Sequence, residues 1–282
     1  MTSRREFLQA ATLAALSATA RAAQLKTIGV QLYTVRDVLP QKPAEVLNAI
    51  RAIGYREVET SWADYDKIRP MVEASGLKAP SMHIDNTLLN KGADEMSRVV
   101  DQIKLWGFQY ALYPYVPQSE RGGADAIKAF AEKLNRFGEK CHAAGIQFAY
   151  HNHAFESAPA GNQTLFQILI DNTDKRLVGF ELDCFWLAVS GNDPAEFIRK
   201  LSGRVLLLHL KDMARGTERR FNESVPPTAF KEVGNGVLDW PGILRAAAAA
   251  GVKHYFVEQD QTPGDPLDSL RQSYNYLSKL NY

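Results

Sequence analysis

The sequence predicts an α/β protein built as one closed (β/α)₈ barrel, a TIM barrel. Short segments rich in β-branched and aromatic residues alternate with longer helical segments, which gives eight repeats of a strand followed by a helix. Strands that are buried on both faces and joined by helices form a parallel sheet, and eight repeats over about 250 residues match a closed barrel. The expected strands are residues 27–33, 57–60, 79–84, 108–113, 146–152, 178–183, 205–211 and 254–259.

The helical segments repeat apolar residues three and four positions apart, most clearly over 46–53, 126–137 and 243–248. Several are followed by a glycine, which favours the left-handed conformation at a helix C-terminus: Gly54, Gly76, Gly107, Gly145 and Gly251. An open doubly wound sheet is the alternative fold, but the glycine-rich fingerprint typical of it is missing after the first strand. The polar stretch 213–233 is expected to be an enlarged seventh loop near the active site.

Composition narrows the class of protein. The 282 residues are 45% hydrophobic and 23% charged, so a large core is expected and disorder is excluded. Lys and Arg total 33 against 32 for Asp and Glu, a balance that argues against a nucleic-acid partner. Cys141 and Cys184 are far apart in the sequence, so we expect neither a disulfide framework nor a cysteine metal site.

Residues 1–23 have the layout of an export signal. Arg4 and Arg5 precede an alanine-rich apolar segment, and a small-x-small cleavage pattern follows at 20–22. The paired arginines resemble the twin-arginine signal, which implies removal of 1–23, the twin-arginine export machinery as a partner and a periplasmic barrel of residues 24–282. An amphipathic first helix is the alternative. No later segment is long and apolar enough for a membrane anchor.

Polar side chains gather at the ends of the predicted strands, where a barrel of this kind has its active site. Four of the six histidines lie there, namely His83, His151, His153 and His209. Residues two apart share one face of a strand, so His151 with His153, and His209 with Lys211, are expected to point into the barrel mouth together.

Carboxylates accompany these imidazoles at the strand ends. Such groups in a closed space need a positive charge to offset desolvation and repulsion, and a divalent cation supplies it. The expected ligands are Glu156, Asp183, His209 and Glu258, with His151 as the rival of Glu156 on the fifth strand, and Glu181 lies deeper on the sixth. Oxygen and nitrogen donors without a thiolate suit Mn²⁺, Mg²⁺, Co²⁺ or Fe²⁺, and Zn²⁺ is also compatible.

The strand ends resemble those of the sugar phosphate isomerase/epimerase family, a group of xylose isomerase-like TIM barrels. The resemblance rests on YHNHAFE at 150–156, ELDCFW at 181–186, LHLKD at 208–212, EVGNG at 232–236 and VEQD at 257–260. In that family a glutamate, an aspartate, a histidine and a glutamate hold one divalent metal. By position the last three are Asp183, His209 and Glu258, whereas the first glutamate of the family falls at His151, which leaves the first ligand open between His151 and Glu156.

The resemblance implies a reaction that starts with proton abstraction next to a carbonyl, carried out on a keto-sugar or sugar derivative by an isomerase, an epimerase or a related lyase. His151, His153 and Lys211 are the expected proton-transfer or oxygen-polarising residues. The expected sugar-binding wall consists of Tyr33, Trp62, His83, Tyr115 and Trp186.

Two other functions fit the same fold. One is a non-catalytic periplasmic barrel that binds a sugar without turnover. The other is a metal-dependent phosphodiesterase of the AP endonuclease type. That chemistry needs more metal ligands than this chain shows, and it needs a basic DNA-binding face, which a near-neutral chain does not indicate. The sequence leaves the substrate, the metal and any oligomeric state open.

Overall fold

The computed structural model of the chain describes residues 23–282. The predicted export signal therefore lies outside the described residues, apart from Ala23. Within the described part of the chain, no helix combines the length and the apolar character needed to cross a membrane.

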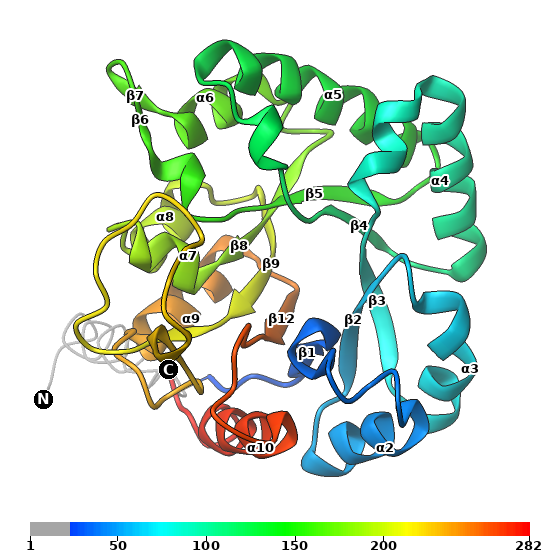
Figure 1. Cartoon of the computed structure of the whole chain (residues 1–282), viewed down its shortest axis with the longest axis vertical. Helices are drawn as coiled ribbons and strands as arrows, with labels where there is room; N and C mark the ends of the chain where they lie inside the picture. Colours follow the sequence, from blue (N-terminus) through cyan, green and yellow to red (C-terminus); the bar gives the residue numbers. More distant parts are fainter. Residues whose placement is uncertain (1–22) are drawn as a thin grey trace, which may run out of the picture.

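Eight parallel strands close into a barrel, which confirms the predicted fold (Figure 1). The first and last of them pair directly, with Gly29 opposite Phe256, so the open-sheet alternative is wrong. All eight predicted strands are present, and their observed bounds are β1 Gly29–Gln31, β2 Glu57–Ser61, β3 Lys78–His83, β4 Tyr110–Tyr113, β5 Gln147–His151, β8 Gly179–Asp183, β9 Val205–Leu210 and β12 His254–Val257.

Helices surround the barrel on its outer side (Figure 1). The longer ones are α2 Pro43–Ile53, α3 Tyr65–Ser75, α4 Ala93–Trp106, α5 Ala124–Ala143, α6 Leu165–Asn172, α8 Pro194–Lys200, α9 Trp240–Ala250 and α10 Pro266–Leu277. Shorter pieces at the strand ends include η1 Leu32–Val35, η2 Asn86–Lys91, η3 Gln118–Glu120, η4 Phe155–Ser157, α7 Cys184–Val189 and η5 Pro227–Ala229. The predicted glycines after helices adopt positive φ, as at Gly76 and Gly107, which end α3 and α4 in the left-handed region.

The core is formed where the apolar stripes of the helices pack on the outer faces of the strands. Helix α5 shows the pattern, since Phe130, Leu134 and Phe137 recur along one side and are buried. The other face of each strand points into the barrel, and there several strands carry polar side chains as well as apolar ones.

Strand register places the polar residues of neighbouring strands side by side. Asp183 on β8 is the register partner of His209 on β9, and His151 on β5 is the partner of Glu181 on β8. Because parallel strands end at the same edge of a sheet, residues far apart in the sequence meet at one end of the barrel.

Asp212 fixes the loop that follows β9. Its buried carboxylate accepts hydrogen bonds from the backbone N–H groups of Gly234, Gly236 and Leu238 at 2.9 to 3.2 Å, and from the indole of Trp240 at 2.7 Å. The predicted seventh loop thus starts at a two-residue strand, β10 (Asp212–Met213), which pairs antiparallel with β11 (Phe230–Lys231). The glycine motif at 232–236 is wrapped around this carboxylate.

Replacing Asp212 with alanine should destabilise the fold by about 3 kcal/mol, because several buried donors lose their acceptor at once. Asp239→Ala is the matched control, since the exposed Asp239 carboxylate accepts one bond, from Gly242 at the start of α9, and its loss should cost only about 1 kcal/mol. Urea unfolding of both variants measures the difference. Equal effects would contradict the anchoring role of Asp212.

Candidate active site

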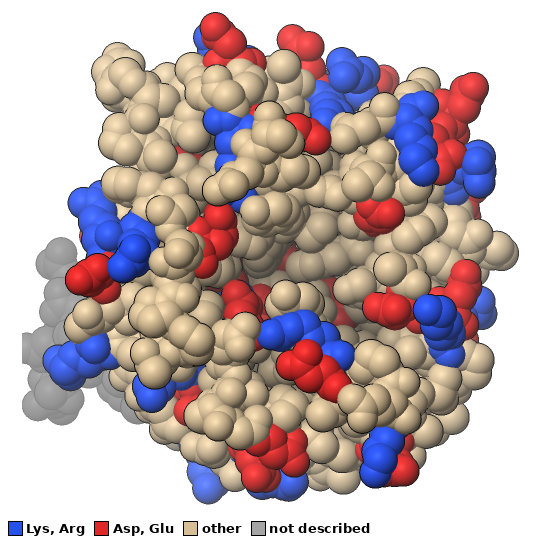
Figure 2. All heavy atoms as spheres, in the orientation of Figure 1, with Lys and Arg blue, Asp and Glu red and all other residues tan. Residues whose placement is uncertain are grey.

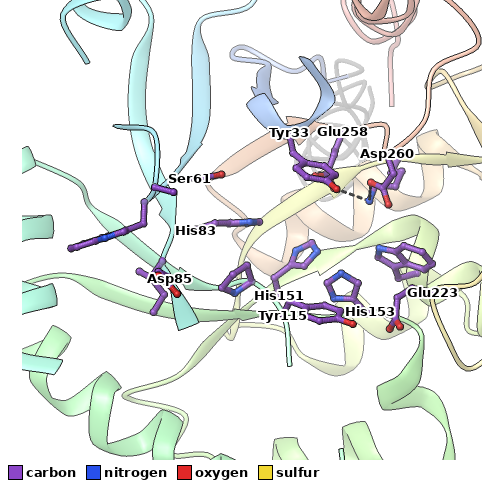
Figure 3. Close-up of a pocket in the computed structure, with 16 residues that line it drawn as sticks. Tyr33, Ser61, His83, Asp85, Tyr115, His151, His153, Glu223, Glu258 and Asp260 are labelled. Carbon is purple, nitrogen blue, oxygen red and sulfur yellow. Dashed lines mark hydrogen bonds and ion pairs between the residues drawn. The ribbon is translucent and has the colours of Figure 1, made fainter. Parts of the chain in front are cut away.

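A pocket opens at the C-terminal ends of the barrel strands. Figure 2 shows a hollow near the middle of the corresponding face, and the cavity has a volume of about 490 Å³. All eight residues predicted as catalytic or sugar-binding line it, and Glu258 lines it too (Figure 3); the eight are Tyr33, Trp62, His83, Tyr115, His151, His153, Trp186 and Lys211.

The predicted wall residues differ in how freely they face the cavity. Tyr33 and Tyr115 are 49% and 37% exposed, so their rings are available to a ligand. Trp62 also packs against the helix layer, since its ring lies 4.9 Å from that of Trp106 at the end of α4. Trp186 is buried, and its ring lies 5.5 Å from the imidazole of His153.

Four buried side chains converge beside this pocket, and two of them, His151 and Glu258, line it. The ligand atoms of His151, Asp183, His209 and Glu258 all lie within 4.8 Å of one another. They come from β5, β8, β9 and the end of β12, which are neighbours in the barrel. Three of these four residues were predicted as metal ligands, and the structure brings those three together.

The fifth strand departs from the predicted set. The Glu156 carboxylate is carried past the end of β5 by η4, where it accepts hydrogen bonds from the Tyr150 hydroxyl at 2.5 Å and from the His153 backbone N–H at 2.9 Å. Glu156 is buried but does not line the pocket. The structure therefore puts His151, and not Glu156, with the other three candidate ligands.

Positive groups hold the carboxylates of the cluster. Glu258 Oε2 lies 3.0 Å from His209 Nδ1 and 2.7 Å from Lys211 Nζ. Burial alone disfavours the charge on Glu258, but Lys211 and His209 outweigh it and keep the pKa of this carboxyl well below its ordinary value. Lys211 Nζ also lies 3.0 Å from Asp183 Oδ2 and 2.7 Å from Asp260 Oδ1.

The donor set fits a divalent cation. Asp183 Oδ2 is fully buried and accepts no aligned hydrogen bond from any residue that the structure describes, although the Lys211 ammonium is near it. Burial opposes protonation of His209, yet the neighbouring Glu181 and Glu258 carboxylates raise its pKa well above the ordinary value. Two carboxylates and two imidazoles whose ligand atoms lie within 4.8 Å of one another form a site of mixed oxygen and nitrogen donors.

His153 lies beside the cluster in a different electrostatic environment. Burial and the nearby His151 and Lys211 hold the pKa of His153 well below its ordinary value, so the ring is neutral at pH 7. Its buried Nδ1 has no hydrogen-bond partner among the described residues. A neutral imidazole that lines the pocket is able to accept a proton, although its lowered pKa makes it a weaker base than a free histidine.

Sequence reasoning missed several polar lining residues, namely Ser61, Asp85 and Glu223. Glu223 comes from the seventh loop, whose position near the pocket was predicted. Arg121 Nη1 lies 2.9 Å from a Glu223 carboxylate oxygen, and its guanidinium stacks on the rings of Phe155 and Tyr115. Ser61 and Asp85 follow the rule of polar strand ends, which could have identified both.

A closed parallel barrel with carboxylates and imidazoles gathered at the C-terminal strand ends defines a TIM barrel whose site is able to hold a metal ion. The chain belongs to the xylose isomerase-like TIM barrel family, whose sequence model matches residues 47–280.

Individual relatives agree with this placement. The chain is 30% identical over 156 residues to an inosose dehydratase of Geobacillus thermodenitrificans, an alignment that covers 51% of each protein. The chain thus spans about half the length of the curated relatives that it matches. A crystal structure of a sugar phosphate isomerase/epimerase from Parabacteroides distasonis superposes with a TM-score of 0.76 at 24% identity, over 93% of this chain and 95% of that one.

A structure from Mycobacterium smegmatis has the same fold. This xylose isomerase-like TIM barrel protein, in complex with magnesium, superposes with a TM-score of 0.64 at 15% identity, over 90% of this chain and 95% of that one.

His151→Ala should weaken Mn²⁺ binding by more than the roughly 10- to 100-fold typical of losing an outer partner, because it removes a converging donor. Glu156→Gln should leave the affinity within about threefold, because Glu156 lies outside the cluster. Titration calorimetry of both folded variants checks this. Loss of Mn²⁺ binding in Glu156→Gln with retention in His151→Ala would restore Glu156 as the ligand.

Glu156 should also give the protein a pH-dependent stability. Burial raises the pKa of its carboxyl from 4.5 to about 7, against the opposing hydrogen bonds from Tyr150 and His153. The folded state then holds a proton that the unfolded chain releases at lower pH, so this contribution is fully present below pH 4.5 and is lost as the pH rises through 7.

The unfolding free energy of the wild type minus that of Glu156→Gln should therefore fall by about 3 kcal/mol across this window. Urea titrations at a series of pH values measure it, and the subtraction removes the contribution of other groups. A difference that stays constant with pH would contradict the raised pKa.

Proposed function

We propose that the protein is a divalent-metal-dependent enzyme that removes a proton next to a carbonyl of a keto-sugar or sugar derivative, as an isomerase, an epimerase or a related lyase. The observation that carries this proposal is the convergence of His151, Asp183, His209 and Glu258 beside an open pocket, which His151 and Glu258 line. A divalent cation held by these residues supplies Lewis acidity for the oxygens of the substrate.

The surrounding residues take the remaining tasks. His153 lines the pocket with a neutral ring, so we assign it as the base that accepts the proton from the substrate carbon. Burial disfavours the charge of Lys211, but Asp183, Asp260 and Glu258 raise its pKa well above the ordinary value and keep it an ammonium. Lys211 is therefore a fixed hydrogen-bond donor to a developing negative oxygen.

The substrate class follows from the wall and from the relatives. Tyr33 and Tyr115 offer exposed rings, which pack against the C–H faces of sugars, while Asp85 and Glu223 accept hydrogen bonds from hydroxyl groups. The curated relatives include inosose dehydratases, so an inosose is the first substrate to test, and loss of water is the first reaction to assay.

The lining charges disfavour the phosphodiesterase alternative. Asp85, Glu223, Glu258 and Asp260 face the pocket with Lys211 as the single lysine or arginine among the described lining residues, and such an acidic mouth repels a polyanion. A periplasmic location after twin-arginine export remains part of the proposal, supported by the pattern around Arg4 and Arg5.

Incubation of the Mn²⁺-loaded protein with an inosose in D₂O should place deuterium at the carbon next to the carbonyl, as read by NMR. Removal of the metal with a chelator should abolish the exchange, and added Mn²⁺ should restore it. Exchange that persists unchanged after chelation would refute metal-dependent proton abstraction, and binding of the sugar without exchange in the loaded protein would support the non-catalytic barrel.

His153→Gln should lower the exchange rate by about 10²- to 10⁴-fold, the usual contribution of a general base. His142→Gln is the matched control, because His142 is exposed on α5 and lies outside the pocket. If both variants exchange at the wild-type rate, the base is another residue.

A further inference from the structure

A second layer of charged side chains lies beneath the four candidate ligands. Glu59 on β2 and Glu181 on β8 are fully buried inside the barrel, and neither lines the pocket. Each lies two residues before a strand end, so each shares the inward face of its strand at a deeper level. Both contact histidines of the cluster, and this layer has no task in the reaction described above. Glu181 also lies within 4.8 Å of His83, His151 and His209, a second group able to hold a cation, but that group is deeper, since Glu181 and His209 do not line the pocket.

His209 meets carboxylates on both sides of its ring. Nδ1 faces the candidate metal ligands, at 3.0 Å from Glu258 Oε2 and 3.8 Å from Asp183 Oδ2. Nε2 faces the deeper layer, at 2.8 Å from Glu59 Oε1 and 3.2 Å from Glu181 Oε2. A metal-bound imidazole has one N–H. Nε2 lies nearest to Glu59, which belongs to neither cluster of possible metal ligands, so Nε2 is the nitrogen that keeps the proton.

His151 has the same arrangement with its nitrogens exchanged. Its Nδ1 lies 3.1 Å from Glu181 Oε2, which makes Glu181 the acceptor for a proton on Nδ1. Nε2 is then the nitrogen of His151 that is left for a cation. Histidine ligands of metals commonly donate their other N–H to a carboxylate in this way.

The two deep carboxylates are themselves held in place. Gln31 donates from Nε2 to Glu59 Oε1 at 2.8 Å. His83 Nε2 lies 2.9 Å from Glu59 Oε1 and 3.0 Å from Glu181 Oε2, so it links the two carboxylates. Burial opposes protonation of His83, but these carboxylates raise its pKa to about 9, and the imidazolium offsets part of their buried charge.

We propose that Glu59 and Glu181 are positioning residues that fix the tautomers of the two histidine ligands. Glu59 accepts the Nε2–H of His209, and Glu181 accepts the Nδ1–H of His151. The metal is therefore bound by His209 Nδ1 and His151 Nε2. This inference rests on the metal site of the proposed function but not on the reaction carried out there.

Zn²⁺ is the probe, because it is diamagnetic and suits mixed oxygen and nitrogen donors. Protein labelled with ¹⁵N-histidine and loaded with Zn²⁺ should show, by two-bond ¹⁵N–¹H correlation, His209 protonated at Nε2 and metal-bound at Nδ1, and His151 with the opposite assignment. Spectra of the variants His83→Gln, His142→Gln, His153→Gln and His254→Gln assign the four remaining rings. The opposite nitrogens in the wild type, or no bound Zn²⁺ at all, would overturn the proposal.

Glu59→Gln should lower the Zn²⁺ affinity by about 10- to 100-fold and leave His209 in a mixture of tautomers, because an amide is a weaker acceptor than a carboxylate. Glu59→Asp keeps a carboxylate, so the share of His209 that is protonated at Nε2 should be larger in this variant than in Glu59→Gln. A merely structural role for Glu59 would change the melting temperature without changing which nitrogen is protonated, and that result would overturn the proposal.

Glu57→Gln is the matched control. Glu57 lies two residues before Glu59 on the same strand and makes the same kind of contact, 2.8 Å from His254 Nδ1, at a site away from the pocket. It should leave the Zn²⁺ affinity and the His209 spectrum unchanged. Correct tautomers in a protein that shows no deuterium exchange would refute the proposed function while leaving this inference intact, so the two failures are distinguishable.

Discussion

The cost of burying negative charge inside a closed barrel governs this structure. Glu59, Glu181, Asp183 and Glu258 are all at least nine-tenths buried, and a carboxylate in such a place needs a positive or hydrogen-bonding partner. Lys211, His83 and His209 provide those partners in two layers, one at the pocket floor and one beneath it. The positions of the imidazole rings, the acidity of the pocket and its suitability for a cation all follow from this balance.

The fold and the centre of the site could be predicted because both depend on periodic features of the sequence. Eight strand segments separated by helices and closed by glycines such as Gly107 specify the barrel. Parallel strands end together, so Asp183, His209 and Glu258 had to meet once the strands were placed.

The parts that the sequence did not predict depend on geometry beyond the strand ends. Glu156 and His151 are both polar residues near the end of β5, and only the path of η4 turns Glu156 toward Tyr150. Glu223 lies in a long loop that also contains Glu218, and no periodicity distinguishes them. Glu59 meets His209 across the barrel interior, a contact between residues 150 positions apart.

The ion pair between Arg121 and Glu223 connects the wall of the pocket entrance to the seventh loop. The guanidinium of Arg121 contacts the ring of Tyr115, which also packs against His153. The same guanidinium forms an ion pair with Glu223 in the loop between β10 and β11. Packed side chains transmit displacement because few voids absorb it. A solute that shifts the Tyr115 ring therefore also displaces the loop. Binding at the pocket entrance is in this way coupled to the position of the loop between β10 and β11.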